Sequence, residues 1–284
     1  MVALLENVAS IDDADARTGL SNADDVKQLF ASEGYLVCDS ICNSFYHGVP
    51  HRRIRWWAAA VHLSTDPLTE EHIENYRDQV ATFHTCLEML CLKPVPLDDI
   101  LMEEGSEEFA IWQAERLATA DSEEPQEGKK KEAWPDLHAE HFRGQGVRHP
   151  PSFSLLYSSA EIDSLRCLPA RAREIVYLFD TLQGRAKVEE VIDVSQSVYR
   201  IPSMEDGLPC ITPKCLLWLR RRFRLVQPNE MLQAQGIALR TRAEVADFAP
   251  ADLRSLAGNA FSAYTCQAMT VSAFSSFKLF RPLL

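Results

Sequence analysis

The first 63 residues carry the pattern that most restricts how this chain can fold. An apolar strand at Met1–Leu5 is followed by an acidic loop, a helical pattern from Asp24 to Ser32 and a second strand. A turn at Gly48-Val49-Pro50 then leads into an apolar run that begins at Trp56. Strands and helices that alternate in this way are typical of a sheet covered by helices. The sequence therefore predicts an α/β fold for residues 1–63.

Two arginines stand at the entry to the third strand. Arg53 and Arg55 are two residues apart, so on a strand they point to the same side while Ile54 points to the other. Two guanidiniums on one side offer forked donors for a phosphate, a carboxylate or the edge of a base. The alternative is that they are only the solvated start of a strand.

Charge and composition exclude some classes of protein. The net charge of −12 over 284 residues argues against a generally basic nucleic-acid binder. Acidic residues are concentrated between 98 and 132, however, and arginines cluster at 52–55, 171–173 and 220–224, so local contacts with phosphate stay open. No apolar run approaches 18 residues, which predicts no membrane segment.

Cysteine and histidine spacing gives no metal signature. The eight cysteines contain no CxxC pair, so we expect reduced thiols in a nuclear or cytoplasmic protein. His72 and His84 lie in a helical pattern over residues 68–92 and have no partner at i+4, so we do not expect them to bind metal. Lys129-Lys130-Lys131 is either part of a nuclear targeting patch or a solvated loop.

Four motifs in sequence order resemble the later motifs of the cytosine-5 methyltransferases. The first is the strand that ends in Glu6-Asn7-Val8, and the second is the turn that opens the strand with Arg53-Ile54-Arg55. Residues 224–236 resemble the family's Arg-x-Leu-Thr-Pro-x-Glu…Gln-Gly motif, and residues 256–262 its final Gly-Asn motif, although Leu256 stands where a glutamine is usual. Together the motifs span nearly the whole chain.

The resemblance implies an organisation in three parts. Residues 1–63 would form the end of a Rossmann-like sheet of an S-adenosylmethionine-dependent methyltransferase. Residues 64–208 would form a smaller, mixed α+β target-recognition region. Within it, the local residue pattern itself predicts helices near 109–119 and 166–182, and the polar composition predicts a disordered loop near 121–133. Residues 209–284 would return to the catalytic domain.

The same resemblance implies a set of site residues. In this family a thiolate adds to the cytosine ring, S-adenosylmethionine supplies the methyl group, and the base is flipped out of the duplex. Glu6 stands where a glutamate contacts N3 of the base, and Arg53 and Arg55 stand at the arginine pair that meets the base. His51 replaces the family's glutamine. The expected cofactor and nucleic-acid contacts are Gly258, Asn259 and Ala260 for the cofactor, and Arg220, Arg221, Arg222 and Arg224 for phosphate.

Two motifs of the family are expected to be missing. Its Phe-x-Gly-x-Gly cofactor loop and its Pro-Cys nucleophile both precede Glu-Asn-Val, but only five residues precede Glu6. Pro209-Cys210 lies far downstream, and we interpret it as part of a short strand before the late motif. The chain alone would therefore hold a cytosine without activating it, and the sheet edge at Met1–Leu5 would be open.

Three interpretations remain. The chain is the C-terminal portion of a cytosine-5 methyltransferase, from a longer product or from a split enzyme whose second chain carries the missing motifs. Alternatively it is a non-catalytic module that binds nucleic acid, or an unrelated α/β protein. Family frequency favours DNA over RNA as the partner.

Overall fold

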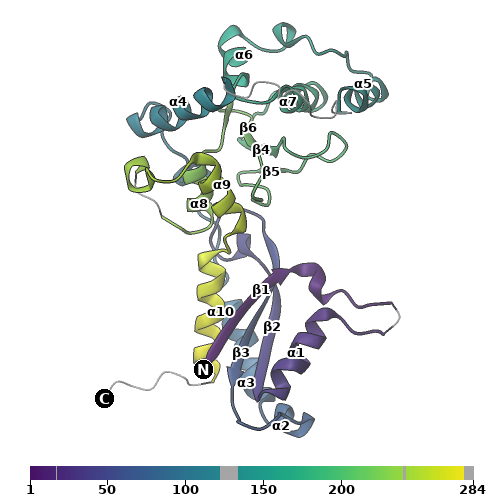
Figure 1. Ribbon diagram of the computed structural model, residues 1–284, viewed down its shortest axis with the longest axis vertical. Coiled ribbons are helices and arrows are strands. Elements are labelled where there is room, and N and C mark those ends of the chain that lie inside the picture. The colour runs from purple at the N-terminus through teal and green to yellow at the C-terminus, as the bar shows by residue number, and fades with distance from the viewer. Residues whose placement is uncertain (17, 122–133, 239–240, 278–284) are drawn as a thin grey trace. The chain divides into compact units, whose positions relative to one another are not determined.

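The computed structural model describes residues 1–16, 18–121, 134–238 and 241–277, and the chain divides into two compact units (Figure 1). Unit 1 joins Met1–Val95 to the C-terminal segment from Phe261, and unit 2 is Pro96–Ala260. Unit 1 contains β1 (Val2–Val8), α1 (Asn22–Ser32), β2 (Tyr35–Asn43), β3 (Ile54–His62), α2 (Glu70–Glu74), α3 (Arg77–Met89) and α10 (Ala263–Ser276).

The sheet of unit 1 has the order β1-β3-β2, and both neighbours of β3 run antiparallel to it. Helices cover both faces of β3. Trp57 and Ala59 pack with α3 and α10 on one face, whereas Trp56 and Ala58 pack with α1 on the other. A strand buried on both faces needs a continuous apolar run, which explains the Trp-Trp-Ala-Ala-Ala-Val sequence.

Unit 2 is built around a smaller, four-stranded sheet with the order β5-β4-β6-β7. Alternate residues of this sheet serve two cores, because Leu217 and Leu219 face one cluster and Trp218 faces the other. Its elements are α4 (Glu107–Asp121), α5 (Trp134–Gly144), α6 (Ser159–Leu165), α7 (Ala170–Gln183), β4 (Glu190–Asp193), β5 (Ser203–Glu205), β6 (Leu217–Leu219), β7 (Arg224–Leu225), α8 (Pro228–Ala234) and α9 (Pro250–Asn259).

The prediction of an α/β fold is confirmed, and several local details differ from the expectation. The helical pattern over 68–92 is interrupted, since α2 ends at Glu74 and α3 begins at Arg77. The strand expected around Cys210 is wrong. This segment is irregular and β6 begins only at Leu217, because Pro209 and Pro213 cannot donate to a sheet ladder.

The boundaries of the units also differ from those expected at 63 and 208. The helix α3 packs on α10 and therefore belongs to unit 1. Leu208 and Ile211 share one core cluster with Leu97 and Trp112, which keeps residues 209–260 in unit 2. The loop expected near 121–133 lies almost wholly outside the described residues.

The described part of the chain carries neither a membrane-spanning helix nor a metal-binding cluster. None of its helices combines the length and apolar character needed to cross a membrane. Within the same residues, no group of three or more His, Cys, Asp or Glu side chains is arranged to hold a metal ion.

Candidate functional site

An acid and two guanidiniums meet across strands β1 and β3. The antiparallel register places Glu6 opposite Trp57, so Arg55 is its diagonal neighbour on the same face. Glu6 Oε1 lies 3.2 Å from Arg55 Nε and 3.6 Å from Arg53 Nη2. The side chains of Glu6, Arg53 and Arg55 are 24%, 7% and 18% exposed, so the cluster is shielded but still reachable from solvent. Both arginines approach the same atom of Glu6, although Arg53 lies just before β3, which begins at Ile54.

A closed turn positions the backbone of Arg53. The hydroxyl of Ser44 donates to the carbonyl of His51 at 2.9 Å and accepts from the backbone N–H of Arg53 at 3.1 Å. Gly48 adopts φ +89°, which favours glycine at the bend. His51 is fully buried beneath this turn. Sequence reasoning did not single out Ser44, because a serine in a turn carries no signal of what its hydroxyl bridges.

The arrangement suits a planar ligand with polar edges. A carboxyl group can accept from an amino group and, when protonated, donate to a ring nitrogen. The guanidiniums of Arg53 and Arg55 supply N–H donors for a carbonyl oxygen beside it. The Watson–Crick edge of cytosine has this arrangement, because its N4 amino group is a donor and its N3 and O2 are acceptors.

The residues expected to meet a cofactor lie at the end of α9. A Cβ on Gly258 would come within 2.1 Å of Pro213 N and 2.2 Å of Thr212 C, so this glycine permits close packing against backbone. Asn259 is exposed, and its amide lies 3.5 Å from Ser255 Oγ. Close packing alone therefore explains why glycine stands at position 258. Gly258, Asn259 and Ala260 do not by themselves enclose a ligand.

The four arginines expected to meet phosphate fall into different environments. Arg220 is 4% exposed and pairs with Asp180 and Glu190. Arg224 is 6% exposed, and its Nη2 lies 2.8 Å from Glu230 Oε1. Both guanidiniums are thus occupied inside unit 2, which is at odds with the expectation that they contact phosphate.

The other two members of this arginine cluster lie nearer to solvent. Arg222 is partly exposed and pairs with Asp98, and it lies close to Glu104 and Glu189. Arg221 is exposed. Of the four, Arg221 therefore keeps the role of a candidate phosphate contact, and Arg222 keeps it only in competition with acidic neighbours.

The environments of several cysteines oppose a nucleophilic role. Burial raises the pKa of Cys38 and Cys215 to about 12 and that of Cys42 to about 11. A thiol must ionise near neutral pH to attack a ring carbon, so these three are poorly suited. Cys210 lies partly buried in the irregular segment before β6, and its Sγ is 3.9 Å from the carbonyl of Ile211.

Residues Phe142-Arg143-Gly144-Gln145-Gly146 match the letters Phe-x-Gly-x-Gly, which sequence reasoning overlooked. The cofactor loop of dinucleotide-type folds follows a strand and opens a helix. Here the letters coincide with the end of α5, and Phe142 is fully buried in the core of unit 2. The structural context of a cofactor loop is therefore absent from this stretch.

Comparisons with known proteins place these observations in a family. A family model described as C-5 cytosine-specific DNA methylase matches residues 1–235. Among solved structures, the Entamoeba histolytica methyltransferase EhMeth is similar at 10% identity with a TM-score of 0.44, and the S. pombe Dnmt2 methyltransferase at 10% identity with a TM-score of 0.45. These alignments cover 99% and 98% of this chain, but 63% and 67% of the other two. No curated protein matches the sequence.

Proposed function

Since this chain belongs to the C-5 cytosine-specific DNA methylase family, we propose that it contributes the base-holding part of a site that transfers a methyl group to C5 of cytosine. One observation carries the proposal: Glu6 Oε1 lies within 3.2 to 3.6 Å of guanidinium nitrogens of Arg55 and Arg53, across two paired strands. The chain spans 63% of EhMeth, so the activity of a whole methyltransferase remains part of the proposal.

Each member of the cluster has a distinct task in this proposal. The carboxyl group of Glu6 meets N3 and the amino group of the base, and it holds a proton at N3 as charge develops on the ring. Arg55, with Arg53 beside it, donates to O2. Ser44 keeps the backbone of Arg53 in place. The electrostatic part of such a site acts because its donors are fixed before the base arrives.

The cofactor expected for this family fits the described residues only in part. S-adenosylmethionine supplies the methyl group when bound, but Gly258 packs against backbone and Asn259 faces solvent. We propose that Asn259 and Ala260 form at most one border of a cofactor pocket. The nucleophilic thiol and the rest of that pocket would come from residues outside these 284, either in a longer product or in a second chain.

The position of β1 leaves room for the missing part of the site, whether it belongs to a longer product or to a second chain. Glu6 lies on β1, an edge strand of the described three-stranded sheet. A further strand could therefore add to the backbone beside Glu6.

DNA is the proposed partner, with RNA as the alternative, and residence in the nucleus or the cytoplasm stays a prediction.

The first test uses the purified 284-residue chain. We expect no cofactor binding by titration calorimetry and no transfer of labelled methyl groups to cytosine-containing duplex DNA. Tight cofactor binding or methyl transfer by this chain alone would contradict the claim that the site is incomplete.

The second test uses the assembly that is active, whether longer product or chain pair. Glu6→Gln should lower kcat by about 10²- to 10³-fold, because it removes the proton donor at N3. Glu70→Gln, on the exposed surface of α2, is the matched control and should leave kcat unchanged. An unchanged kcat in Glu6→Gln would exclude the assigned role. DNA binding without methyl transfer in any assembly would favour the non-catalytic module.

A further inference from the structure

Unit 2 contains a recess that the base-holding cluster does not use. It has a volume of about 180 Å³ and lies among α4, α6 and the hairpin strand β7. Residues that line it include Phe109, Gln113, Asp163, Phe223 and Arg224. An apolar cavity of about 150 Å³ accommodates a benzene ring, so this recess has room for one six-membered ring.

Flat groups line this recess. The guanidinium carbon of Arg224 lies over the Phe109 ring, 4.8 Å from its centroid, which makes a cation–π pair. Hydrogen bonds from Arg224 to Glu230, at 2.8 and 2.9 Å, fix the plane of the guanidinium. Phe223 also lines the recess, and its φ of +56° is a strained backbone conformation for a bulky side chain. The recess therefore offers rigid planar groups for stacking.

Polar groups and balanced charge restrict the ligand further. The amide of Gln113 offers both a donor and an acceptor, and Asp163 offers an acceptor. The charge of Arg224 is compensated by Glu230, and that of Asp163 by Arg166, whose Nη2 lies 3.4 Å away. The recess thus favours a neutral, planar ring with hydrogen-bonding edges over a charged or purely apolar ligand.

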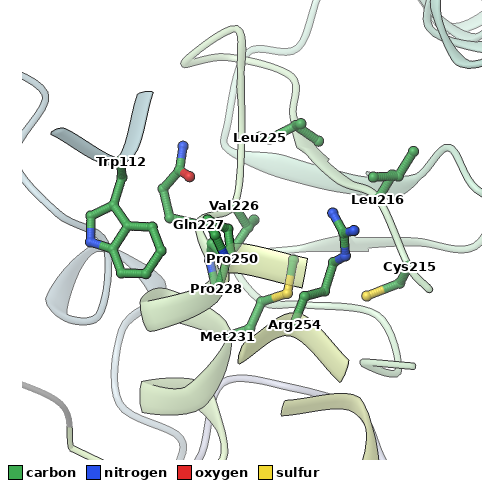
Figure 2. A pocket seen from close by; sticks show the side chains of 10 residues that line it. All are labelled: Trp112, Cys215, Leu216, Leu225, Val226, Gln227, Pro228, Met231, Pro250 and Arg254. Carbon is green, nitrogen blue, oxygen red and sulfur yellow. The ribbon is translucent and has the colours of Figure 1, made fainter. Parts of the chain in front are cut away.

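A smaller recess of about 20 Å³, with room for little more than a water molecule, adjoins the first and contributes a cation. Leu225 and Gln227 line both recesses. Figure 2 shows Trp112 and Arg254 on opposite sides of the smaller one, with Gln227 and Pro228 between them. Among the described residues, Arg254 Nε is buried and has no hydrogen-bond partner, in contrast to the carboxylate-paired Arg220 and Arg224. A guanidinium whose Nε has no partner, beside a recess, suits an anion.

We propose that one nucleotide unit of a nucleic-acid strand binds here, with only its base inside a recess. The base enters the larger recess against the Arg224–Phe109 pair, and a neighbouring phosphate meets Arg254. This site is separate from the Glu6 cluster, and it rests on the proposed function only in taking nucleic acid as the partner. The same chemistry occurs in a free nucleotide, so the test compares both sources.

The first experiment fills the base recess. The probes are a short single-stranded cytosine oligonucleotide, the same strand with abasic sites in place of its bases, and cytidine monophosphate. Affinity is measured by fluorescence anisotropy for the strands and by chemical-shift changes for the nucleotide. The variant is Gln113→Trp, and the control is Gln145→Trp, an exposed glutamine of unit 2 that does not line the recess.

The expected losses follow from stacking. Gln113→Trp should weaken binding of the cytosine strand about tenfold, whereas Gln145→Trp should not. The wild-type chain should bind the abasic strand about tenfold more weakly than the cytosine strand, and Gln113→Trp should abolish this difference. Equal affinity of the wild-type chain for both strands, or an unchanged affinity in Gln113→Trp, overturns the inference. Binding of the monophosphate but not of the strand would mean a site for free nucleotides and overturns the nucleic-acid part.

The second experiment tests the phosphate contact. Arg254→Gln should reduce the salt dependence of strand binding by about one unit of log K per log salt concentration. Arg77→Gln removes the same charge from the exposed surface of unit 1 and should leave the slope unchanged. A slope that Arg254→Gln does not alter refutes the contact. Failure of either experiment leaves the Glu6→Gln result unaffected, because that result is read as methyl transfer.

Discussion

Arg220 illustrates at the scale of one residue how burial changes the role of a guanidinium. Its Nε donates to Asp180 Oδ1 at 2.8 Å, and it also pairs with Glu190 and lies over the ring of Phe179. Burial raises the pKa of Asp180, although the Arg220 guanidinium acts in the opposite direction. Nothing in a run of arginines distinguishes such a core residue from a surface one, so the sequence could not separate Arg220 from Arg221.

This burial leads to a stability prediction. Arg220→Met should lower the free energy of unfolding by about 3 to 5 kcal/mol, because it leaves buried carboxylates without their cation. Urea denaturation measures the loss, and the exposed Arg221→Met should change it by less than about 0.5 kcal/mol. A near-neutral Arg220→Met would mean that the acidic partners reach solvent.

At the end of helix α9, a single glycine allows close packing. Because Gly258 has no side chain, α9 packs directly against the backbone of Thr212 and Pro213. Gly258→Ala should cost about 1 to 3 kcal/mol, because the new methyl group has to displace backbone. Gly144→Ala, at the end of α5 with no atom within 4 Å of its added Cβ, is the control and should be neutral or slightly stabilising. Thermal unfolding of the two variants compares them directly.

The start of α1 gives a prediction for acid conditions. Hydrogen bonds from the backbone N–H and the hydroxyl of Ser21 lower the pKa of Asp24 from 3.8 to about 2. A depressed folded-state pKa stabilises the fold above pH 3.8, and this contribution is lost as the pH falls towards 2. The difference in melting temperature between the wild type and Asp24→Asn should therefore become smaller as the pH falls across this range. Asp25→Asn, in the same turn, is the control, and a pH-independent difference would exclude the effect.

Features that depend on residues close together in the sequence could be predicted from it, whereas features that depend on contacts between distant segments could not. The strands and α1 of residues 1–63 follow local patterns, as does the placement of Arg53 and Arg55 near one another, so the sequence predicts them well. The helix α9 went unpredicted, and the unit boundaries depend on packing between segments far apart in the chain. The Ser44 bridge and the recess beside Phe109 likewise depend on such contacts, which no motif records.

At the scale of the whole molecule, each unit has its own cores. The Arg220 network lies wholly within unit 2. Hydrogen exchange followed by mass spectrometry should therefore show faster exchange in unit 2 for Arg220→Met, whereas β2 and β3 keep their wild-type protection. An equal increase in both units would mean that the chain opens as one cooperative body.

The discontinuity of unit 1 has a consequence for synthesis on the ribosome. Its core includes Ala268, Met269 and Ala273 of α10, which pack with α3 and the sheet whose strands were made first. The core of unit 1 therefore cannot be completed until α10 is synthesised, and the α10-facing side of Trp57 stays uncovered while the whole of unit 2 emerges and folds. A nascent chain stalled before residue 263 would carry a finished middle and an unfinished beginning, and it is this species that chaperones would need to shield.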